Sequence, residues 1–281
     1  MLGITRRAAV LAAAADGHPA RLFKGGEPGF CLPSVAEAFR FGTLWQDSAG
    51  STPGAVGLTV GRVGFIAGRS SIASQTTATK RPLLTTDSKS IPLLRFDGLD
   101  DCLVTPSIDF SACEAVTVIV GIRKNAGTAT GLVFEHGPVS TPGNFGVFAP
   151  GISANDGNNI LGVVHGTLNG GFSYAFKAGS STVFASVFVG SELTRRDKAP
   201  IYSLNGNSMA PRGVAGYGYT DTDVLGQGNF TTAVAYIGQR DALSIPFNGD
   251  LYSLTVVGRR ISNAEMLNTS RWINQQMGVV Y

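Results

Sequence analysis

The chain has 281 residues, of which 43% are hydrophobic and 15% charged, and its formal net charge is +3. This length fits one large all-β domain or two modest domains. The nearly balanced charge argues against nucleic-acid binding, which needs a clustered basic face. No apolar run approaches the roughly 20 residues that a helix needs to cross a bilayer, so membrane insertion is not expected.

We predict that residues 1–30 form an arm ahead of the main domain. The alanine-rich run after Arg6 and Arg7 is similar to an export signal, but it is short, so we interpret it as a helix. Asp16 and Gly17 supply a stop for this helix. Because so short a helix is marginal alone, we expect the arm to dock on a neighbouring protein or on a second copy of the chain.

The rest of the chain, residues 31–281, is predicted to be one domain with an irregular lead-in over residues 31–92. From residue 92 onward, short apolar runs alternate with turns, and we expect about ten strands in an antiparallel double sheet. The run over residues 115–123 is almost continuously apolar, as in a strand that is buried on both faces. The other predicted strands cover residues 130–137, 144–151, 160–166, 170–179, 182–190, 199–207, 232–240 and 249–260.

A helix is predicted at the end of the domain, over residues 262–278. Ser262 can cap this helix, and Glu265 three residues later completes a capping box, while Gly278 suits its end. The helix carries an apolar stripe that we expect to pack on the rim of the sandwich: Met266, Trp272, Ile273 and Met277.

The three cysteines are Cys31, Cys102 and Cys113. An odd number without a spacing motif argues against a disulfide framework and against a zinc site. Assembly in a reducing cytoplasm is the simplest interpretation. A bridge between Cys102 and Cys113 stays open, because neighbouring strands could bring the two thiols together.

Four stretches carry a resemblance to a known superfamily. They are LRFDGLDDCL (94–103), IYSLNGN (201–207), YIGQR (236–240) and the closing segment from FNGDLYSL to NQQMG (247–278). In this order they resemble the concanavalin A-like lectin/glucanase superfamily, in its laminin-G-like branch. The resemblance implies an all-β fold, an antiparallel jelly-roll β-sandwich with the arm before it and the helix at its C-terminal end.

A second resemblance covers part of the lead-in. The segment QDSAG at residues 46–50, with the residues that follow it, is similar to the front half of many phage and prophage virion proteins. In those proteins such a segment precedes a laminin-G-like sandwich. The resemblance implies a place in a virion, on the tail, a fibre or the capsid exterior, after assembly in the bacterial host cytoplasm.

Catalytic carboxylates are the next feature to test. Glucanases of this superfamily carry spaced carboxylates on one strand, so that an acid and a nucleophile flank the sugar bond. The sequence has no such strand, and Glu135 stands alone in VFEHG, followed by His136, which we expect to cap a turn. We therefore predict that the chain is not an enzyme and has no catalytic residue.

Asp97, Asp100 and Asp101 surround a glycine between two apolar runs. Aspartate and glycine are typical of tight turns, so we interpret the stretch as a turn that fixes strand register. The alternative is a calcium site at these three residues, with further oxygens from the loops at 153–159 and 219–229. No other cofactor is expected.

Aromatic rings commonly form the platforms on which sugars bind. Tyr217 and Tyr219 lie in a glycine-rich segment that continues to Asp221, and they are the candidate glycan-binding residues. The alternative is that these rings close the edge of the sandwich or contact a neighbouring subunit.

The sequence thus predicts a non-enzymatic structural protein of a phage virion. Its partners would be other virion proteins and copies of itself, bound through the arm. The alternative is a carbohydrate-binding module or adhesin that recognises host surface glycan through Tyr217, Tyr219 and Asp221.

Overall fold

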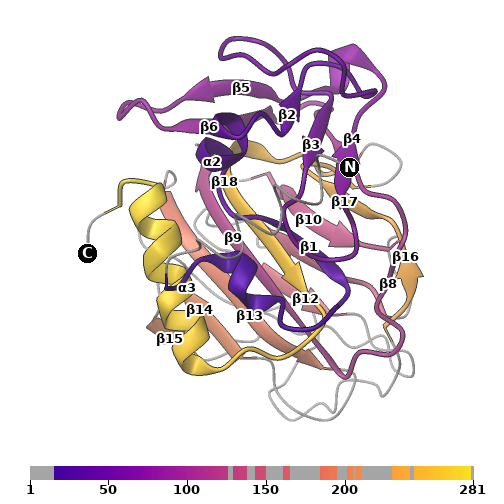
Figure 1. Cartoon of the computed structure of the whole chain (residues 1–281), viewed down its shortest axis with the longest axis vertical. Coiled ribbons are helices and arrows are strands. Elements are labelled where there is room, and N and C mark those ends of the chain that lie inside the picture. The colour runs from indigo at the N-terminus through magenta and orange to yellow at the C-terminus, as the bar shows by residue number, and fades with distance from the viewer. Residues whose placement is uncertain are drawn as a thin grey trace.

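Two antiparallel sheets pack against each other around one hydrophobic core (Figure 1). The computed structural model describes residues 16–125, 129–137, 143–149, 230–240 and 244–279, and the backbone of four further strands, 161–164, 184–194, 201–204 and 207–209. The architecture is the predicted concanavalin A-like, jelly-roll β-sandwich with a helix at its C-terminal end.

Sheet A contains eight strands, and all its strand pairs are antiparallel. Its order is β15 (Asn207–Met209), β14 (Ile201–Leu204), β13 (Phe184–Thr194), β9 (Ala115–Lys124), β18 (Asn248–Val257), β6 (Pro92–Asp97) and β5 (Leu83–Thr86). The eighth strand, β1 (Gly29–Leu32), also pairs with β18. Strands β1 and β6 therefore share one edge of β18, β1 along residues 254–257 and β6 along residues 248–251.

Sheet B also contains eight strands, and a short two-stranded sheet lies beside it. The order of sheet B is β12 (Leu161–Val164), β11 (Phe145–Phe148), β10 (Leu132–His136), β17 (Ala235–Ile237), β7 (Leu103–Val104), β4 (Ile72–Ser74), β3 (Arg62–Gly64) and β2 (Leu44–Trp45). The small sheet pairs β16 (Thr232–Ala233) with β8 (Ile108–Asp109). The helical elements are η1 (Pro19–Leu22), α2 (Val35–Arg40), η2 (Ala78–Lys80) and α3 (Asn263–Gln276). No helix of the described residues is long and apolar enough to cross a membrane.

Strand β9 shows most directly how the apolar content of a segment determines its place in the sheet. It lies between β13 and β18, where Val120 is opposite Phe188 on one side and Leu254 on the other. Val118 and Val120 pack in the core between the sheets, whereas Ile119 packs in the cluster with α3. Both faces of the strand are covered, which explains its almost continuous apolar run. The strand predicted over residues 115–123 is confirmed.

The N-terminal part of the described chain lies against the sandwich. The His18 ring packs edge-on against Trp272, with 4.6 Å between ring centroids, and its Nε2 is 3.0 Å from Glu37 Oε2. Leu22 is buried beneath α3. Residues 16–30 of the predicted arm are thus packed on the domain, while a boundary at residue 30 stays a prediction.

The lead-in holds more regular structure than the sequence predicted. Between residues 31 and 92 it contains α2 and strands β2 to β5, which extend both sheets. These strands have two to four residues each. A strand this short contains only one or two repeats of inward and outward positions, so its pattern does not stand out in the sequence.

Helix α3 confirms the predicted C-terminal helix and its capping box. The Ser262 hydroxyl accepts the Glu265 N–H, and the Glu265 carboxylate accepts the Ser262 N–H. The apolar stripe packs on the outer face of sheet A, against Leu93, Ile119 and Tyr252, and not on the rim as predicted. Figure 1 shows the helix lying along this sheet. A Cβ at Gly121 would lie 2.7 Å from Ile273 Cγ2, so glycine permits this close contact.

Replacing Ser262 by alanine should lower the free energy of unfolding by about 1 kcal/mol, because it removes the hydroxyl that satisfies the Glu265 N–H. Urea unfolding followed by far-UV circular dichroism measures the change. Ser107→Ala, at an exposed serine away from the helix, is the matched control. Equal effects of the two substitutions would contradict the role of the cap.

Candidate functional site

The three predicted aspartates lie on a short arch that joins the two sheets. Strand β6 of sheet A ends at Asp97, and strand β7 of sheet B begins at Leu103. We call residues 97–102 the arch. The predicted turn exists, but the strands on its two sides belong to different sheets. The turn therefore directs the chain across the sandwich, and the two strands that it joins are not paired with each other.

Hydrogen bonds within the arch explain part of its sequence. The Asp97 N–H donates to Asp101 Oδ2 at 3.0 Å, and the Leu99 N–H donates to Asp97 Oδ1 at 2.8 Å. Gly98 has a φ of 78°, and a Cβ there would lie 2.8 Å from Asn248 Cβ. Glycine is the residue that fits this backbone and this space. Two of the three aspartates thus bind backbone amides, as is typical of turns.

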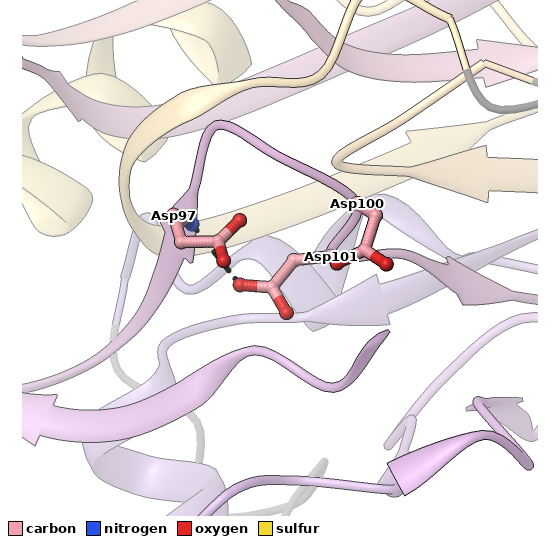
Figure 2. Close-up of side chains that lie close together, drawn as sticks. All are labelled: Asp97, Asp100 and Asp101. Carbon is pink, nitrogen blue, oxygen red and sulfur yellow. Dashed lines mark hydrogen bonds between the residues drawn. The ribbon is translucent and has the colours of Figure 1, made fainter. Parts of the chain in front are cut away.

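Figure 2 shows that the three side chains converge. One carboxylate oxygen from each of Asp97, Asp100 and Asp101 lies within 4.8 Å of the others. Asp97 is exposed, Asp100 is half-buried and Asp101 is only 6% exposed. Burial, together with the charges of Asp97 and Asp100, raises the pKa of Asp101 to about 6. Such a cluster can hold a cation or a proton, and with Asp101 inside the protein it suits a small ion better than a sugar ring.

Gln239 is a neighbour of the arch that the sequence analysis missed. Strands β17 and β7 pair with Ile237 opposite Leu103, and the chain then bends at Gly238, which has a φ of 92°, before it reaches Gln239. Gln239 is fully buried, and its Nε2 donates a long hydrogen bond of 3.5 Å to the Leu99 carbonyl oxygen. Its Oε1 has no hydrogen-bond partner among the described residues. A buried amide oxygen in this state is unfavourable unless something else binds it.

The sequence indicated that Glu135 stands alone, but in the structure it forms an ion pair with Arg240. Arg240 donates two hydrogen bonds to its carboxylate, from Nε to Oε2 at 3.0 Å and from Nη2 to Oε1 at 2.9 Å. The guanidinium also lies over the Phe148 ring, 5.4 Å from its centroid. The Glu135 side chain is 3% exposed, so this ion pair is mostly removed from water. The pairing gives Glu135 a structural role.

His136 is a core residue, and the prediction that it caps a turn is wrong. Its ring lies between Phe110 and Phe145, each with its centroid 4.9 Å away, and its Nε2 is 3.1 Å from the Ile108 carbonyl oxygen. Burial lowers the pKa of His136 to about 4. Strand β10 ends at His136, but alternation along the strand turns this side chain toward the core.

The QDSAG segment forms a loop that its own aspartate holds closed. The Asp47 carboxylate accepts the N–H groups of Gly50 at 2.7 Å, Ser51 at 3.1 Å and Thr52 at 2.6 Å. The hydrogen bonds from Ser51 and Thr52 lower the pKa of Asp47 below its ordinary value. The residues that carry the second resemblance therefore have a clear local role in the fold.

The remaining predicted site residues are placed as follows. Tyr217, Tyr219 and Asp221 lie outside the described residues, as do the loops at 153–159 and 219–229. The three cysteines are buried and none of them is in a disulfide, so the Cys102–Cys113 bridge that the sequence left possible is not formed.

The chain shares its fold with solved structures of a sialidase. Trypanosoma rangeli sialidase is 13% identical with a TM-score of 0.55, over 100% of this chain and 38% of the sialidase. The same enzyme in complex with sialic acid is 14% identical with a TM-score of 0.54, over 100% and 38% of the two chains. The chain thus spans about two fifths of the sialidase's length. No protein-family model and no curated protein sequence matches it.

This likeness corrects the prediction that the chain is not an enzyme. Structures of an enzyme, a sialidase, match it over its whole length. The sequence argument tested only one arrangement of carboxylates on one strand, which is too narrow to exclude catalysis. At 13 to 14% identity the likeness shows the fold and assigns no activity. The virion location and the assembly role of the arm stay predictions.

Proposed function

We propose that this chain is a glycan-binding β-sandwich domain. One observation supports the proposal above others: over its whole length the chain shares its fold with a sialidase whose structure has been solved in complex with sialic acid. A β-sandwich presents loops of different length from a rigid scaffold, and such loops commonly carry the binding residues.

Tyr217, Tyr219 and Asp221 are the residues that we propose contact the glycan. A tyrosine ring can stack on the apolar face of a pyranose, and its hydroxyl can bond the sugar's own hydroxyls. A carboxylate such as that of Asp221 accepts hydrogen bonds from two neighbouring sugar hydroxyls. Two rings and one carboxylate within five residues could orient a single sugar unit.

Replacing Tyr217 and Tyr219 together by alanine should abolish glycan binding by the full chain. The measurement is an array of sialylated and neutral glycans, probed with the wild type and the double variant. Phe41→Ala is the matched control, because Phe41 is an exposed aromatic residue just after α2 that the proposal does not use. Thermal unfolding of all three proteins checks that the fold is kept.

Two results would count against the proposal. If the wild type binds no glycan on the array, glycan binding is not its function. If the tyrosine double variant binds glycan as well as the wild type does, the binding site does not include Tyr217 and Tyr219. Sugar released from sialylated glycans in the same incubation would add catalysis to binding.

A further inference from the structure

We propose that the outer face of sheet B binds an extended acidic glycan chain, which lies across the strands from Trp45 to Tyr236. The inference rests on the proposed glycan-binding function and deepens it, because it names the class of glycan and a further set of contact residues. These residues form a row of cross-strand partners, which we call the outer row: Trp45, Arg62, Ser74, Val104 and Tyr236.

The strand register builds the outer row. Trp45 on β2 is opposite Arg62 on β3, which is opposite Ser74 on β4. Ser74 is also opposite Val104 on β7, which is opposite Tyr236 on β17. Opposite residues on antiparallel strands point to the same side, so all five side chains share one face of the sheet. Neighbouring strands are about 4.8 Å apart, so four steps place the two aromatic residues roughly 19 Å apart.

The outer row faces away from the core. The core residues of these five strands are its neighbours in sequence: Leu44, Val63, Ala73, Leu103 and Ile237. Each member of the outer row is half-buried, so each keeps part of its surface in contact with water. The described α-helices pack on sheet A, α2 against β6 and β18 and α3 against β13. A ligand can therefore approach this face of sheet B.

Gly64 and Arg62 fix the position of the Trp45 ring. A Cβ at Gly64 would lie 3.2 Å from Trp45 Cζ3, so glycine gives the ring room to lie against β3. The Arg62 guanidinium carbon is 5.4 Å from the ring centroid, within the range of a cation–π contact. A ring that is ordered before binding loses little conformational entropy when a sugar stacks on it.

Arg62 supplies the charge that selects an acidic chain. Its Nη1 donates to the Ala49 carbonyl oxygen at 2.7 Å, so the loop that contains QDSAG orients the guanidinium. Arg62 forms no ion pair with an aspartate or glutamate among the described residues. Next to Tyr236 the row continues to Glu135, which is already paired with Arg240. The outer row therefore complements a carboxylate, the group that the arginine fork binds best.

The length and the composition of the outer row suit a chain of sugars. The rings of Trp45 and Tyr236 can each stack on the apolar face of a pyranose and offer a polar group beside it. Between them, the Ser74 hydroxyl can both donate and accept hydrogen bonds, as sugar hydroxyls require, and Val104 adds apolar contact. A row of roughly 19 Å extends beyond a single sugar unit, so it distinguishes a chain from one terminal sugar.

The test uses the full chain and an array of uronic-acid, sialylated and neutral glycans of one to six sugar units. We expect binding to strengthen with chain length and to favour acidic chains. Trp45→Ala and Tyr236→Ala should each weaken binding at least tenfold, whereas Trp45→Phe, which keeps a ring, should lose less. Ser74→Trp should block binding, because it places a bulky ring in the middle of the row.

A second pair of variants tests the charge. Arg62→Gln should remove the preference for acidic over neutral chains of the same length. Arg21→Gln is the matched control, because Arg21 is an exposed arginine on the N-terminal arm that the proposal does not use, and it should keep the preference. Thermal unfolding of every variant checks that the fold is kept.

The outcomes separate this inference from the proposed function. If the wild type binds no glycan, both are wrong. If it binds glycan and Trp45→Ala, Tyr236→Ala and Ser74→Trp all bind as the wild type does, the outer row is not the site and the proposed function stands. A wild type that prefers neutral chains, or that binds single sugars as tightly as chains, would overturn the proposed ligand. Trp45 lies on a two-residue strand at the edge of sheet B, so Trp45→Ala decides the question even where Tyr236→Ala fails to fold.

Discussion

Replacing Arg240 by methionine should lower the free energy of unfolding by about 3–5 kcal/mol. The substitution keeps most of the side-chain length but removes both hydrogen bonds and the positive charge that Arg240 brings to Glu135. Glu135 then keeps a negative charge at a position where its side chain is 3% exposed, and a buried charge that loses its counterion is strongly destabilising. Urea unfolding at neutral pH, followed by intrinsic fluorescence, measures the loss.

The control is the double variant Glu135→Gln with Arg240→Met. It removes both charges, so it should be more stable than Arg240→Met alone, and a double-mutant cycle gives the coupling energy of the pair. A coupling energy near zero, with a loss below about 1 kcal/mol for Arg240→Met, would show that the pair behaves like an exposed salt bridge.

Acidification from pH 7 to pH 4 should destabilise the fold by about 3 kcal/mol through His136 alone. Burial lowers the pKa of His136 to about 4 in the folded chain, from the ordinary value of 6.5 in the unfolded chain. Between these two values the unfolded chain binds a proton that the folded chain does not, so the stability present above pH 6.5 is lost as the pH falls toward 4. Each pKa unit corresponds to about 1.4 kcal/mol, which sets the size of the effect.

The comparison that isolates His136 is His136→Gln, which is neutral throughout this pH range. Free energies of unfolding are measured by urea titration at intervals of pH for both proteins, and the difference between the two curves is followed. We expect the wild type to lose stability more steeply than the variant below pH 6.5. Parallel curves would mean that other groups account for the acid sensitivity.

The sequence predicts the secondary structure best for elements whose periodicity and end signals lie within their own residues. Strand β9 is apolar along nearly all its length, and helix α3 has its capping box and apolar stripe within 20 residues. Both are found where their patterns place them. Their local periodicity and end signals need no knowledge of the rest of the fold.

The arch shows why the candidate site was only half predicted. Asp97, Asp100 and Asp101 are close in sequence, so a turn and an acidic cluster could both be expected. Gln239 joins them only because β17 pairs with β7, a contact between segments that are more than 130 residues apart. The arch also connects two sheets, and the sequence of a short strand does not say to which sheet it belongs.

The sequence predictions for Glu135 and for His136 were wrong for the same physical reason. Arg240 reaches Glu135 across 105 positions of the chain, so no local motif marks the pair. His136 is followed by a glycine, which is typical of a turn, but the facing rings of Phe110 and Phe145 decide its burial. Long-range packing outweighs local preference in both cases.

The place of β18 in sheet A governs the order in which this protein can fold on the ribosome. The strand lies between β9 on one side and β1 with β6 on the other, although it is synthesised after all three of them. Until residue 257 has left the exit tunnel, β1 lacks the strand that it pairs with in sheet A, and β9 presents an open apolar edge. A growing chain with these edges is prone to pair with other chains, so synthesis of β18 is the step that protects it from aggregation.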